Sequence, residues 1–239
     1  MSIDMKDPDV AREERRIKSA YQKINKPASY YSWFDQGNLF LIHERERLIL
    51  QRLRRHDREP LAGSRFLEVG CGSGHWLREF IKWGVAPNDV TGIDLREEVL
   101  PIAANLCPQG VTLQCMNGST LDFPDESFDL VLQSLVFTSI LDDGMKHHMA
   151  QEMLRVLKKT GLLVWYDFHV NNPWNPNVRG VRKAEIMRLF PNCHIELERV
   201  SLAFPVAKFF APWSWMTCYF LSWLRFLNTH YLGVIQKRG

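Results

Sequence analysis

The stretch that decides the fold is Phe66-Leu-Glu-Val-Gly70-Cys-Gly72-Ser-Gly74, in which a short apolar run leads into three alternate glycines. The apolar run predicts a buried strand, and residues 74–82 predict the helix that follows it. Glycines are needed in such a turn because the backbone must approach a bound ligand closely, and a side chain would block that approach. Alone, the same pattern would also suit an ordinary glycine-rich turn.

Working outward, strands and helices alternate along most of the chain, which predicts a parallel sheet with helices on both faces. The expected strands are 65–69, 90–93, 111–115, 128–133 and 161–168, and the expected helices are 74–82, 97–105, 145–158 and 181–190. Two more strands, 194–202 and 230–237, should pair antiparallel at the sheet edge, with the last one inserted beside the fifth. The predicted fold class is α/β, with seven mostly parallel strands and an antiparallel last strand.

Length and composition predict one well-packed domain with appendages, because the chain has 239 residues, of which 46% are hydrophobic and 24% charged. Residues 1–60 predict an N-terminal helical cap or lid, with helices over 10–26 and 39–56. Residues 61–239 form the main domain.

Charge argues against nucleic-acid binding by bulk electrostatics, since 30 Lys and Arg stand against 27 Asp and Glu and the net charge is only +3. Basic residues concentrate in the cap. Acidic residues are interleaved with them, namely Glu13, Glu14, Glu44 and Glu46. These helices are therefore interpreted as having solvated charged faces.

The cysteines and the N-terminus indicate a cytoplasmic protein. The five cysteines show no paired short spacing typical of a zinc or redox site, so free thiols in a reducing compartment are expected. The first 18 residues are polar and charged, which is unlike a secretory signal.

The spacing of the glycines also separates two cofactor classes. A nicotinamide-binding loop reads Gly-x-Gly-x-x-Gly, whereas here the third glycine comes one position early and Glu68 precedes the first. That acid suits a cationic amino acid group better than a pyrophosphate. Asp94, at the end of Val90-Thr-Gly-Ile-Asp94, is placed to accept hydrogen bonds from both ribose hydroxyls of an adenosine ligand, although it could instead cap the next helix.

A third motif, Met116-Asn-Gly-Ser-Thr-Leu-Asp-Phe-Pro-Asp-Glu-Ser-Phe-Asp129, and a fourth, Leu154-Arg-Val-Leu-Lys-Lys-Thr-Gly161, follow at matching intervals. With these, the sequence resembles the class I S-adenosylmethionine (SAM) dependent methyltransferases, especially the bacterial group that methylates small molecules, lipids and saccharides. The resemblance is firm over residues 64–168 and loose elsewhere. It implies a Rossmann-like fold, SAM as cofactor and S-adenosylhomocysteine as product.

The resemblance assigns roles to the motif residues. It places Glu68, Gly70, Gly72 and Gly74 around the methionine part of SAM, with Cys71 as a spacer in the same loop. It places Asp94 on the ribose, Leu95 against the adenine, and Asn117 with Gly118 at the adenine edge. Similar enzymes usually have Asp where Asn117 stands, and an amide oxygen can still accept from the adenine amino group.

Gln133 and Ser134 end the fourth expected strand and face the transferring methyl in similar enzymes. They are not acidic, and no Asn-Pro-Pro-aromatic motif occupies this place. The sequence therefore predicts no metal, and it argues against catechol-type enzymes and against amino-methylating enzymes of DNA. Asn172-Pro-Trp174 looks superficially similar, but it follows the fifth strand and is expected to be a turn.

Methyl transfer depends mainly on holding the nucleophile in line with the methyl carbon, and a base is needed only for a poorly ionised hydroxyl. The candidate bases at the carboxyl end of the sheet are His169 and Asp167. Imidazole titrates in a suitable range, so His169 is preferred, with an ordinary hydrogen-bonded loop residue as the alternative.

Aromatic residues of the cap and one asparagine are candidate lid or substrate residues, namely Tyr21, Tyr30, Tyr31, Trp33 and Asn172. They could close over the cofactor or grip the acceptor, and ordinary packing of the cap explains the aromatics equally well.

The segment 204–228 is expected to be an aromatic helical insertion between the last two strands. A buried packing helix is the favoured interpretation. A wall of an apolar substrate pocket and a peripheral contact with a membrane surface remain open. The uncharged run is too short for the roughly 20 residues of a transmembrane helix.

The sequence thus predicts metal-independent O-methylation of a small molecule or of a saccharide- or lipid-linked intermediate. A methyltransferase acting on RNA or protein is one alternative, suggested by the basic cap. A non-catalytic SAM-binding interaction module is another. The oligomeric state and the acceptor are not fixed by these motifs.

Overall fold

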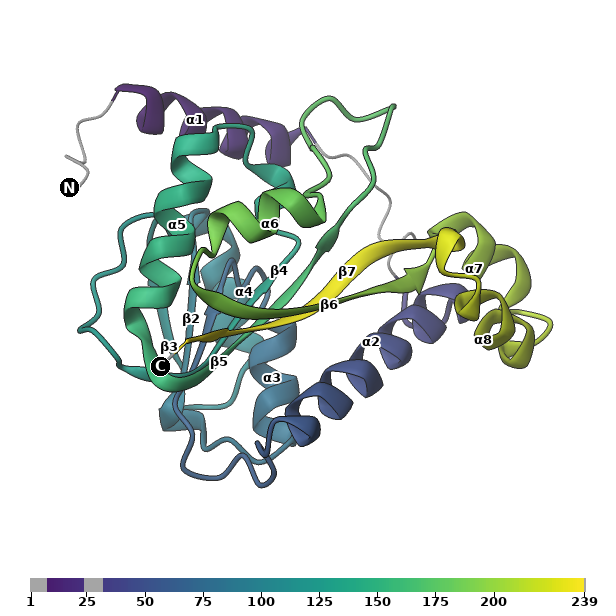
Figure 1. Cartoon of the computed structure of the whole chain (residues 1–239), viewed down its shortest axis with the longest axis horizontal. Coiled ribbons are helices and arrows are strands. Elements are labelled where there is room, and N and C mark those ends of the chain that lie inside the picture. Colours follow the sequence, from purple (N-terminus) through teal and green to yellow (C-terminus); the bar gives the residue numbers. More distant parts are fainter. Residues whose placement is uncertain (1–7, 24–31, 239) are drawn as a thin grey trace.

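A seven-stranded sheet in the order β3-β2-β1-β4-β5-β7-β6 forms the centre of the computed structural model, which describes residues 8–23 and 32–238 (Figure 1). The parallel strands are β1 (Phe66–Val69), β2 (Val90–Asp94), β3 (Thr112–Cys115), β4 (Phe128–Ser134) and β5 (Leu157–Phe168). The predicted α/β fold class with a mostly parallel sheet is confirmed.

The last two strands, β6 (Cys193–Leu202) and β7 (Asn228–Lys237), are antiparallel neighbours. β7 also pairs antiparallel with β5, with Phe168 opposite His230. The final strand is therefore inserted between the fifth and sixth, as the sequence predicts.

Eight α-helices lie in the described part of the chain. They are α1 (Pro8–Gln22), α2 (Gln36–Arg55), α3 (His75–Lys82), α4 (Leu100–Leu106), α5 (Asp143–Val156), α6 (Lys183–Leu189), α7 (Phe204–Phe210) and α8 (Trp215–Trp223). The helix predicted over 97–105 is divided into a 3₁₀ turn, Glu97–Val99, and α4. Pro101 lies in the first turn of α4, where its missing N–H leaves no bond unmade, so the α-helix begins beside it.

The two faces of the sheet bury separate cores because alternate strand residues point to opposite sides. Leu67 and Val131 face a core that α5 and α6 cover, whereas Phe66 and Leu130 face one that α2 and α3 cover. Each core residue named here is fully buried.

The two N-terminal helices lie on opposite sides of this sheet. Ile17 of α1 belongs to the core of the α5 side, and Ile49 of α2 belongs to the core of the α3 side. In Figure 1, α1 crosses the end of α5 while α2 runs beneath the sheet. The division into a cap over 1–60 and a main domain stays a prediction.

The expectation of solvated charged faces on these helices is wrong for three of the four acids. Glu13, Glu44 and Glu46 are 7%, 3% and 8% exposed. Burial raises the pKa of both Glu44 and Glu46. Burial would also raise the pKa of Glu13, but Arg16 and the N–H of Leu141 outweigh it and lower that pKa. The alternation of acidic and basic residues along these helices did not predict exposed acids, because these acids have partners elsewhere in the fold.

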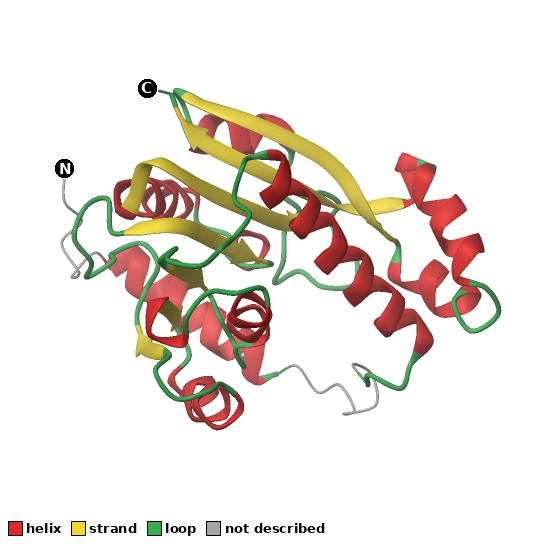
Figure 2. Cartoon of the chain, turned by 90° about the horizontal axis from the view of Figure 1, so that it is seen from below, coloured by secondary structure: helices red, strands yellow, loops and turns green. Residues whose placement is uncertain are grey.

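The expectation of one buried packing helix over 204–228 is also wrong, because this segment forms two short helices. Pro212 stands between α7 and α8 and cannot continue a helix. Six of its large apolar side chains are mostly exposed: Phe209 67%, Trp213 86%, Met216 82%, Phe220 63%, Trp223 80% and Phe226 76%. Figure 2 shows both helices projecting beyond the end of the sheet. Among the described residues, no helix has the length and apolar character needed to cross a membrane.

Candidate cofactor-binding site

The glycine loop after β1 is bound to the end of β2. The backbone N–H groups of Gly70 and Cys71 both donate to the carbonyl of Ile93 at 2.8 Å. Gly70 has φ of +77°, a conformation that other residues adopt only with strain. A Cβ at Gly70 would lie 2.4 Å from Cγ2 of Val136, so the position also lacks room for a side chain.

The carboxylate of Asp94 lies beside this loop and is 5% exposed. It accepts hydrogen bonds from the N–H of Gly72 at 2.8 Å and from the N–H of Arg96 at 2.9 Å. Nε of Arg96 lies 3.2 Å from the same carboxylate, and the guanidinium lies 4.1 Å from the ring centroid of Tyr21. The acid is therefore held in one orientation at the carboxyl end of β2.

A cleft with a volume of about 200 Å³ opens at this edge of the sheet. Small-molecule sites commonly measure roughly 300–1,000 Å³, so the cleft would have to widen around a nucleoside-sized ligand. Six predicted residues line it: Tyr21, Gly70, Asp94, Leu95, Asn117 and Gly118. Ile93, Met116 and Met149 add apolar wall of the kind that contacts a flat base.

The other predicted loop residues lie behind the lining. Gly72 and Gly74 shape the turn, and Cys71 is buried, which raises the pKa of its thiol. Gly74 has left-handed backbone and precedes α3. None of the three lines the cleft, so their contribution is to the course of the backbone.

Two buried polar atoms near the loop have no hydrogen-bond partner among the described residues. They are Oε2 of Glu68 and Nε2 of Gln133, at the ends of neighbouring strands. Burial, reinforced by the charge of Asp94, raises the pKa of Glu68 well above its ordinary value. Unpaired buried polar groups are unfavourable, and a ligand with ammonium and carboxylate groups could satisfy them. The donor set fits an adenosine ligand that carries an amino acid.

Asn117 is held differently from the prediction for the adenine edge. Its amide oxygen accepts two hydrogen bonds from Ser119, at 2.8 Å from the N–H and 2.9 Å from the hydroxyl. Its amide nitrogen donates to the carboxylate of Glu14 on α1. The side chain therefore connects the β3 loop with α1.

Helix α1 covers the cleft through contacts with the loop after β4. The carboxylate of Glu13 accepts from the N–H of Leu141 at 2.6 Å, and Arg16 donates to the carbonyl of Ser139 at 2.5 Å. The hydroxyl of Tyr21 lies 3.0 Å from that of Ser139. Sequence reasoning found Tyr21 but missed Ile17, Arg96 and Ser139, because no local pattern relates α1 to a loop more than 100 residues away.

Two other candidates, Trp33 and Asn172, do not join this cluster. Trp33 is 52% exposed and its ring lies 6.0 Å from that of His75. Tyr30 and Tyr31 lie outside the described residues. Oδ1 of Asn172 accepts from the N–H of Trp174 at 3.0 Å, which makes this segment a turn, as predicted.

Comparison with known proteins agrees with this geometry. Residues 66–161 match the family model described as a methyltransferase domain. This match covers 96 of the 239 residues. The matched residues include the glycine loop, Asp94 and Asn117, which are the parts of the methyltransferase domain that form the cleft.

Individual relatives are more distant. Demethylmenaquinone methyltransferase of Staphylococcus aureus is 25% identical over 158 residues, which are 65% of this chain and 61% of that protein. Two solved structures share the fold of the methyltransferase domain. A SAM-dependent methyltransferase of Mesorhizobium loti has a TM-score of 0.59 at 18% identity, covering 78% of this chain and 96% of its own. The 1,6-didemethyltoxoflavin N1-methyltransferase of Burkholderia thailandensis has a TM-score of 0.62 at 16% identity. This match covers 100% of this chain and 94% of that structure's chain.

The two candidate bases lie beside the cleft of the methyltransferase domain without lining it. Asp167 is fully buried, and its carboxylate accepts from the N–H of Phe168 and from the N–H and hydroxyl of Thr138. Burial raises the pKa of Asp167 to about 6, against these hydrogen bonds. The carboxylate holds the loop after β4 and presents no free oxygen toward the cleft.

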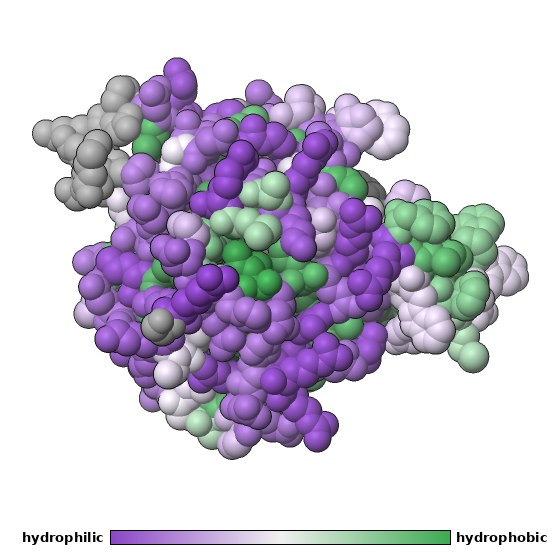
Figure 3. All heavy atoms as spheres, in the orientation of Figure 1, coloured by the Kyte–Doolittle hydropathy of each residue, from purple (hydrophilic) through white to green (hydrophobic). Residues whose placement is uncertain are grey.

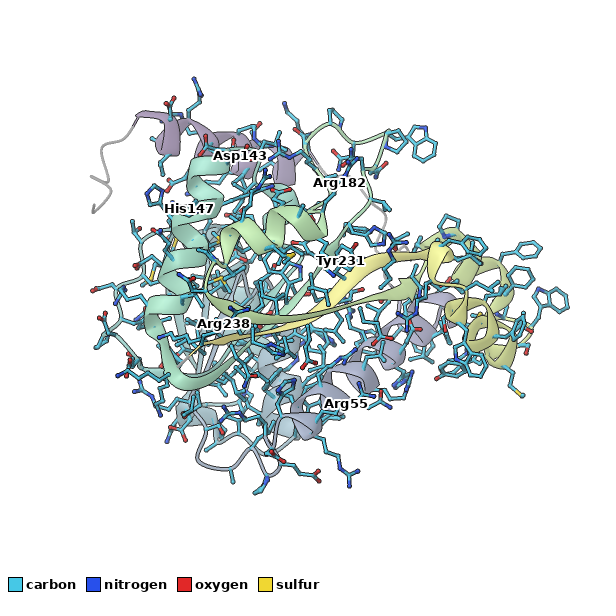
Figure 4. The ribbon with its side chains drawn as sticks, viewed as in Figure 1. Arg55, Asp143, His147, Arg182, Tyr231 and Arg238 are labelled. Carbon is cyan, nitrogen blue, oxygen red and sulfur yellow. The ribbon has the colours of Figure 1, made fainter. Side chains whose placement is uncertain are left out.

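His169 packs against β7 instead. Its Nε2 lies 2.9 Å from the carbonyl oxygen of Asn228, and its ring lies 4.6 Å from that of Tyr231, which Figure 4 labels on β7. Burial lowers the pKa of His169. This is the hydrogen-bonded loop residue that the sequence left as the alternative, and the role of general base stays a prediction.

Proposed function

We propose that the methyltransferase domain transfers a methyl group from SAM to a hydroxyl of a small molecule or of a lipid- or saccharide-linked intermediate, without a metal ion. The observation that carries the proposal is the buried carboxylate of Asp94, which Gly72 and Arg96 hold in the lining of the cleft. SAM, when bound, would supply an activated methyl group, whose carbon the nucleophile attacks while the C–S bond breaks and S-adenosylhomocysteine leaves as a thioether.

The residues that would hold the cofactor follow from the cleft. Asp94 would accept from the ribose hydroxyls, and Leu95, Met116 and Met149, which line the same cleft, would pack on the adenine. Glu68, whose raised pKa reflects burial, would be stabilised in its charged form by the amino group of the ligand.

The acceptor would enter beside the loop that follows β4. Ser134, Leu135, Val136, Ser139 and Ile140 line this part of the cleft. Apolar walls exclude water, and the serine hydroxyls can orient a polar group, so positioning would supply most of the rate. Neither Gln133 nor Ser134 is an acid that would suit a metal ligand, which supports a metal-independent reaction.

The ionisable residues of this cleft also bear on the acceptor. Among the described lining residues they are Tyr21, Asp94 and Arg96, and Asp94 is assigned to the ribose. With no histidine in the lining, the acceptor that fits best is a hydroxyl acidic enough to ionise by itself, such as a phenol or an enol.

A direct test is incubation with SAM labelled in the methyl group and a panel of phenols, enols, sugars and lipid-linked intermediates, with and without EDTA. We expect a labelled methyl ether whose rate of formation EDTA does not change. Product analysis that finds an N-methyl or C-methyl group would overturn the O-methyl assignment. A rate abolished by EDTA and restored by a divalent metal would overturn the metal-independent mechanism.

A further inference from the structure

The surface formed by α7 and α8 is apolar on its outward side. Met216, Phe220 and Trp223 of α8 follow each other at intervals of four and three residues, which places them on one helix face, and they are 63–86% exposed together with Trp213 of the connecting turn. Phe209 and Phe226 extend the same apolar set. We call these six residues the apolar tip.

The opposite face of α8 explains why the tip is held outward. Phe40 of α2 contacts Trp215 and Tyr219 edge to face, with ring centroids 5.7 and 5.0 Å apart. The salt bridge from Lys208 to Asp35, at 2.9 Å, fixes α7 to the start of α2. The helix is thus apolar on both sides, although only one side is buried. Such a helix is typical of burial in protein or in a membrane.

The shape of the tip distinguishes between these two environments. Figure 3 shows the end of the molecule formed by α7 and α8 as a projection coloured green to white, beyond a body that is mostly purple on this face. A protein interface of standard size uses about 20–30 residues a side over a broad complementary patch. Six large side chains on a protruding end are better suited to insertion into a soft apolar layer.

The charged residues of the projecting segment are cations. The chain has no acidic residue after Glu198, and the segment 203–227 carries Lys208, which pairs with Asp35 at 2.9 Å, and Arg225, which pairs with Glu198 at 3.3 Å and has a side chain that is 68% exposed. The guanidinium of Arg47 lies 5.8 Å from the ring centroid of Tyr219, at the edge of the same projection. Cations at the base of an apolar tip lie at the level of lipid headgroups when the tip is inserted.

We infer that α7 and α8 form a docking element that inserts the apolar tip into the interfacial layer of an anionic lipid bilayer. α8 has nine residues, too few to cross a bilayer, so it would lie in the interfacial layer rather than span the membrane. Trp213 and Trp223 would lie at the interface, where tryptophan is enriched.

Docking would also orient the cleft. β6 ends at Leu202 and β7 begins at Asn228, opposite the carboxyl end of β5, so α7 and α8 leave the same edge of the sheet at which the cofactor cleft opens. A lipid-linked acceptor would therefore approach from the side on which the cleft lies. This consequence rests on the proposed function, whereas membrane binding itself depends only on the surface of α7 and α8.

The test is co-sedimentation of the full chain with vesicles of phosphatidylcholine and phosphatidylglycerol at 7:3. We compare wild type with the double variant Phe220→Ser/Trp223→Ser, which changes exposed side chains only. Trp174→Ser is the matched control, because Trp174 is 89% exposed on a loop remote in sequence from α7 and α8. We expect the double variant to bind vesicles at least tenfold more weakly, and Trp174→Ser to bind like wild type.

Vesicle binding that is absent in wild type, or equally strong in the double variant, would overturn the inference. So would sedimentation velocity that shows a wild-type dimer dissociated by the double variant, without binding to vesicles, since the tip would then contact a second copy. Titration with S-adenosylhomocysteine in the same samples keeps the two proposals separate: intact cofactor binding without vesicle binding contradicts the docking element alone, and the reverse contradicts the proposed function alone.

Discussion

The carboxylate of Asp94 accepts a 2.8 Å hydrogen bond from the backbone N–H of Gly72, which joins the end of β2 to the glycine loop that follows β1. The two motifs are separate in the sequence, but this bond makes them one rigid unit. A cofactor site formed in this way is preorganised, so less ordering is required on binding.

The first prediction concerns the space at Gly70. In Gly70→Ala the new Cβ would lie 2.4 Å from Val136, and the residue has φ of +77°. We expect affinity for S-adenosylhomocysteine to fall at least tenfold, because Val136 and the loop must move where they line the cleft. Isothermal titration calorimetry checks this.

Gly63→Ala is the matched control for this experiment. Gly63 has φ of +80° but nothing within 4 Å of the added Cβ. Both variants should lose roughly 1–2 kcal/mol of stability from the strained backbone, and only Gly70→Ala should lose ligand affinity. Equal affinity in the two variants would contradict the assignment of Gly70 to the cleft.

The second prediction concerns how α1 is held over the cleft. Glu13 accepts from the N–H groups of Leu141 and Asp142 and pairs with Arg16. In Glu13→Ala we expect amide hydrogen exchange in residues 8–22 to accelerate at least tenfold, because hydrogen bonds to a charged group contribute about 1.5–3 kcal/mol each. Exchange followed by mass spectrometry gives the rate.

Arg12→Ala is the control on the same helix. Arg12 pairs with Asp9 at 3.0 Å, and both side chains are largely exposed. Exposed pairs contribute little, so exchange in α1 should stay near the wild-type rate. If both variants accelerated exchange to the same extent, the contacts of Glu13 would not be what holds α1.

The third prediction concerns pH and Asp167. Burial raises its pKa from the ordinary value of 3.8 to about 6, so between these values the folded protein binds the proton more tightly than the unfolded chain does. Stability therefore falls as pH rises from 4 to 7. Over this range the free energy of unfolding of wild type should fall by about 3 kcal/mol more than that of Asp167→Asn, because the variant has no carboxyl group to titrate at this position.

Urea unfolding of wild type and Asp167→Asn at several pH values measures this difference. Asp167→Asn is expected to be less stable throughout, because an amide replaces one of the oxygens that Thr138 and Phe168 contact. The diagnostic quantity is how the difference in free energy of unfolding between wild type and Asp167→Asn changes with pH. If the free energies of unfolding of the two proteins changed in parallel between pH 4 and 7, the raised pKa of Asp167 would be contradicted.

The fold and the cofactor motifs could be predicted because their signals are local. Alternating apolar strands and the glycine loop restrict the backbone directly, and Asp94 follows its strand immediately. The antiparallel place of β7 beside β5 was also predicted, although α7 and α8 lie between β6 and β7 in the chain.

The contacts of α1 could not be predicted in the same way. Glu13 and Arg16 look like an exposed helical pair at a spacing of three residues, and nothing local shows that Ser139 and Leu141 bind them. The exposure of α8 was missed for the opposite reason. Aromatic residues are usually buried, and the sequence of 215–223 does not reveal that Phe40 covers only one side.

The measurement that tests the central claim most directly is calorimetric titration of wild type, Asp94→Ala and the exposed control Asp122→Ala with SAM and with S-adenosylhomocysteine. We expect micromolar binding of both ligands by wild type and Asp122→Ala. Asp94→Ala should bind at least tenfold more weakly, since each hydrogen bond to a charged acceptor contributes about 1.5–3 kcal/mol. Failure of wild type to bind either ligand, or unchanged affinity in Asp94→Ala, would contradict the assignment of this cleft to SAM.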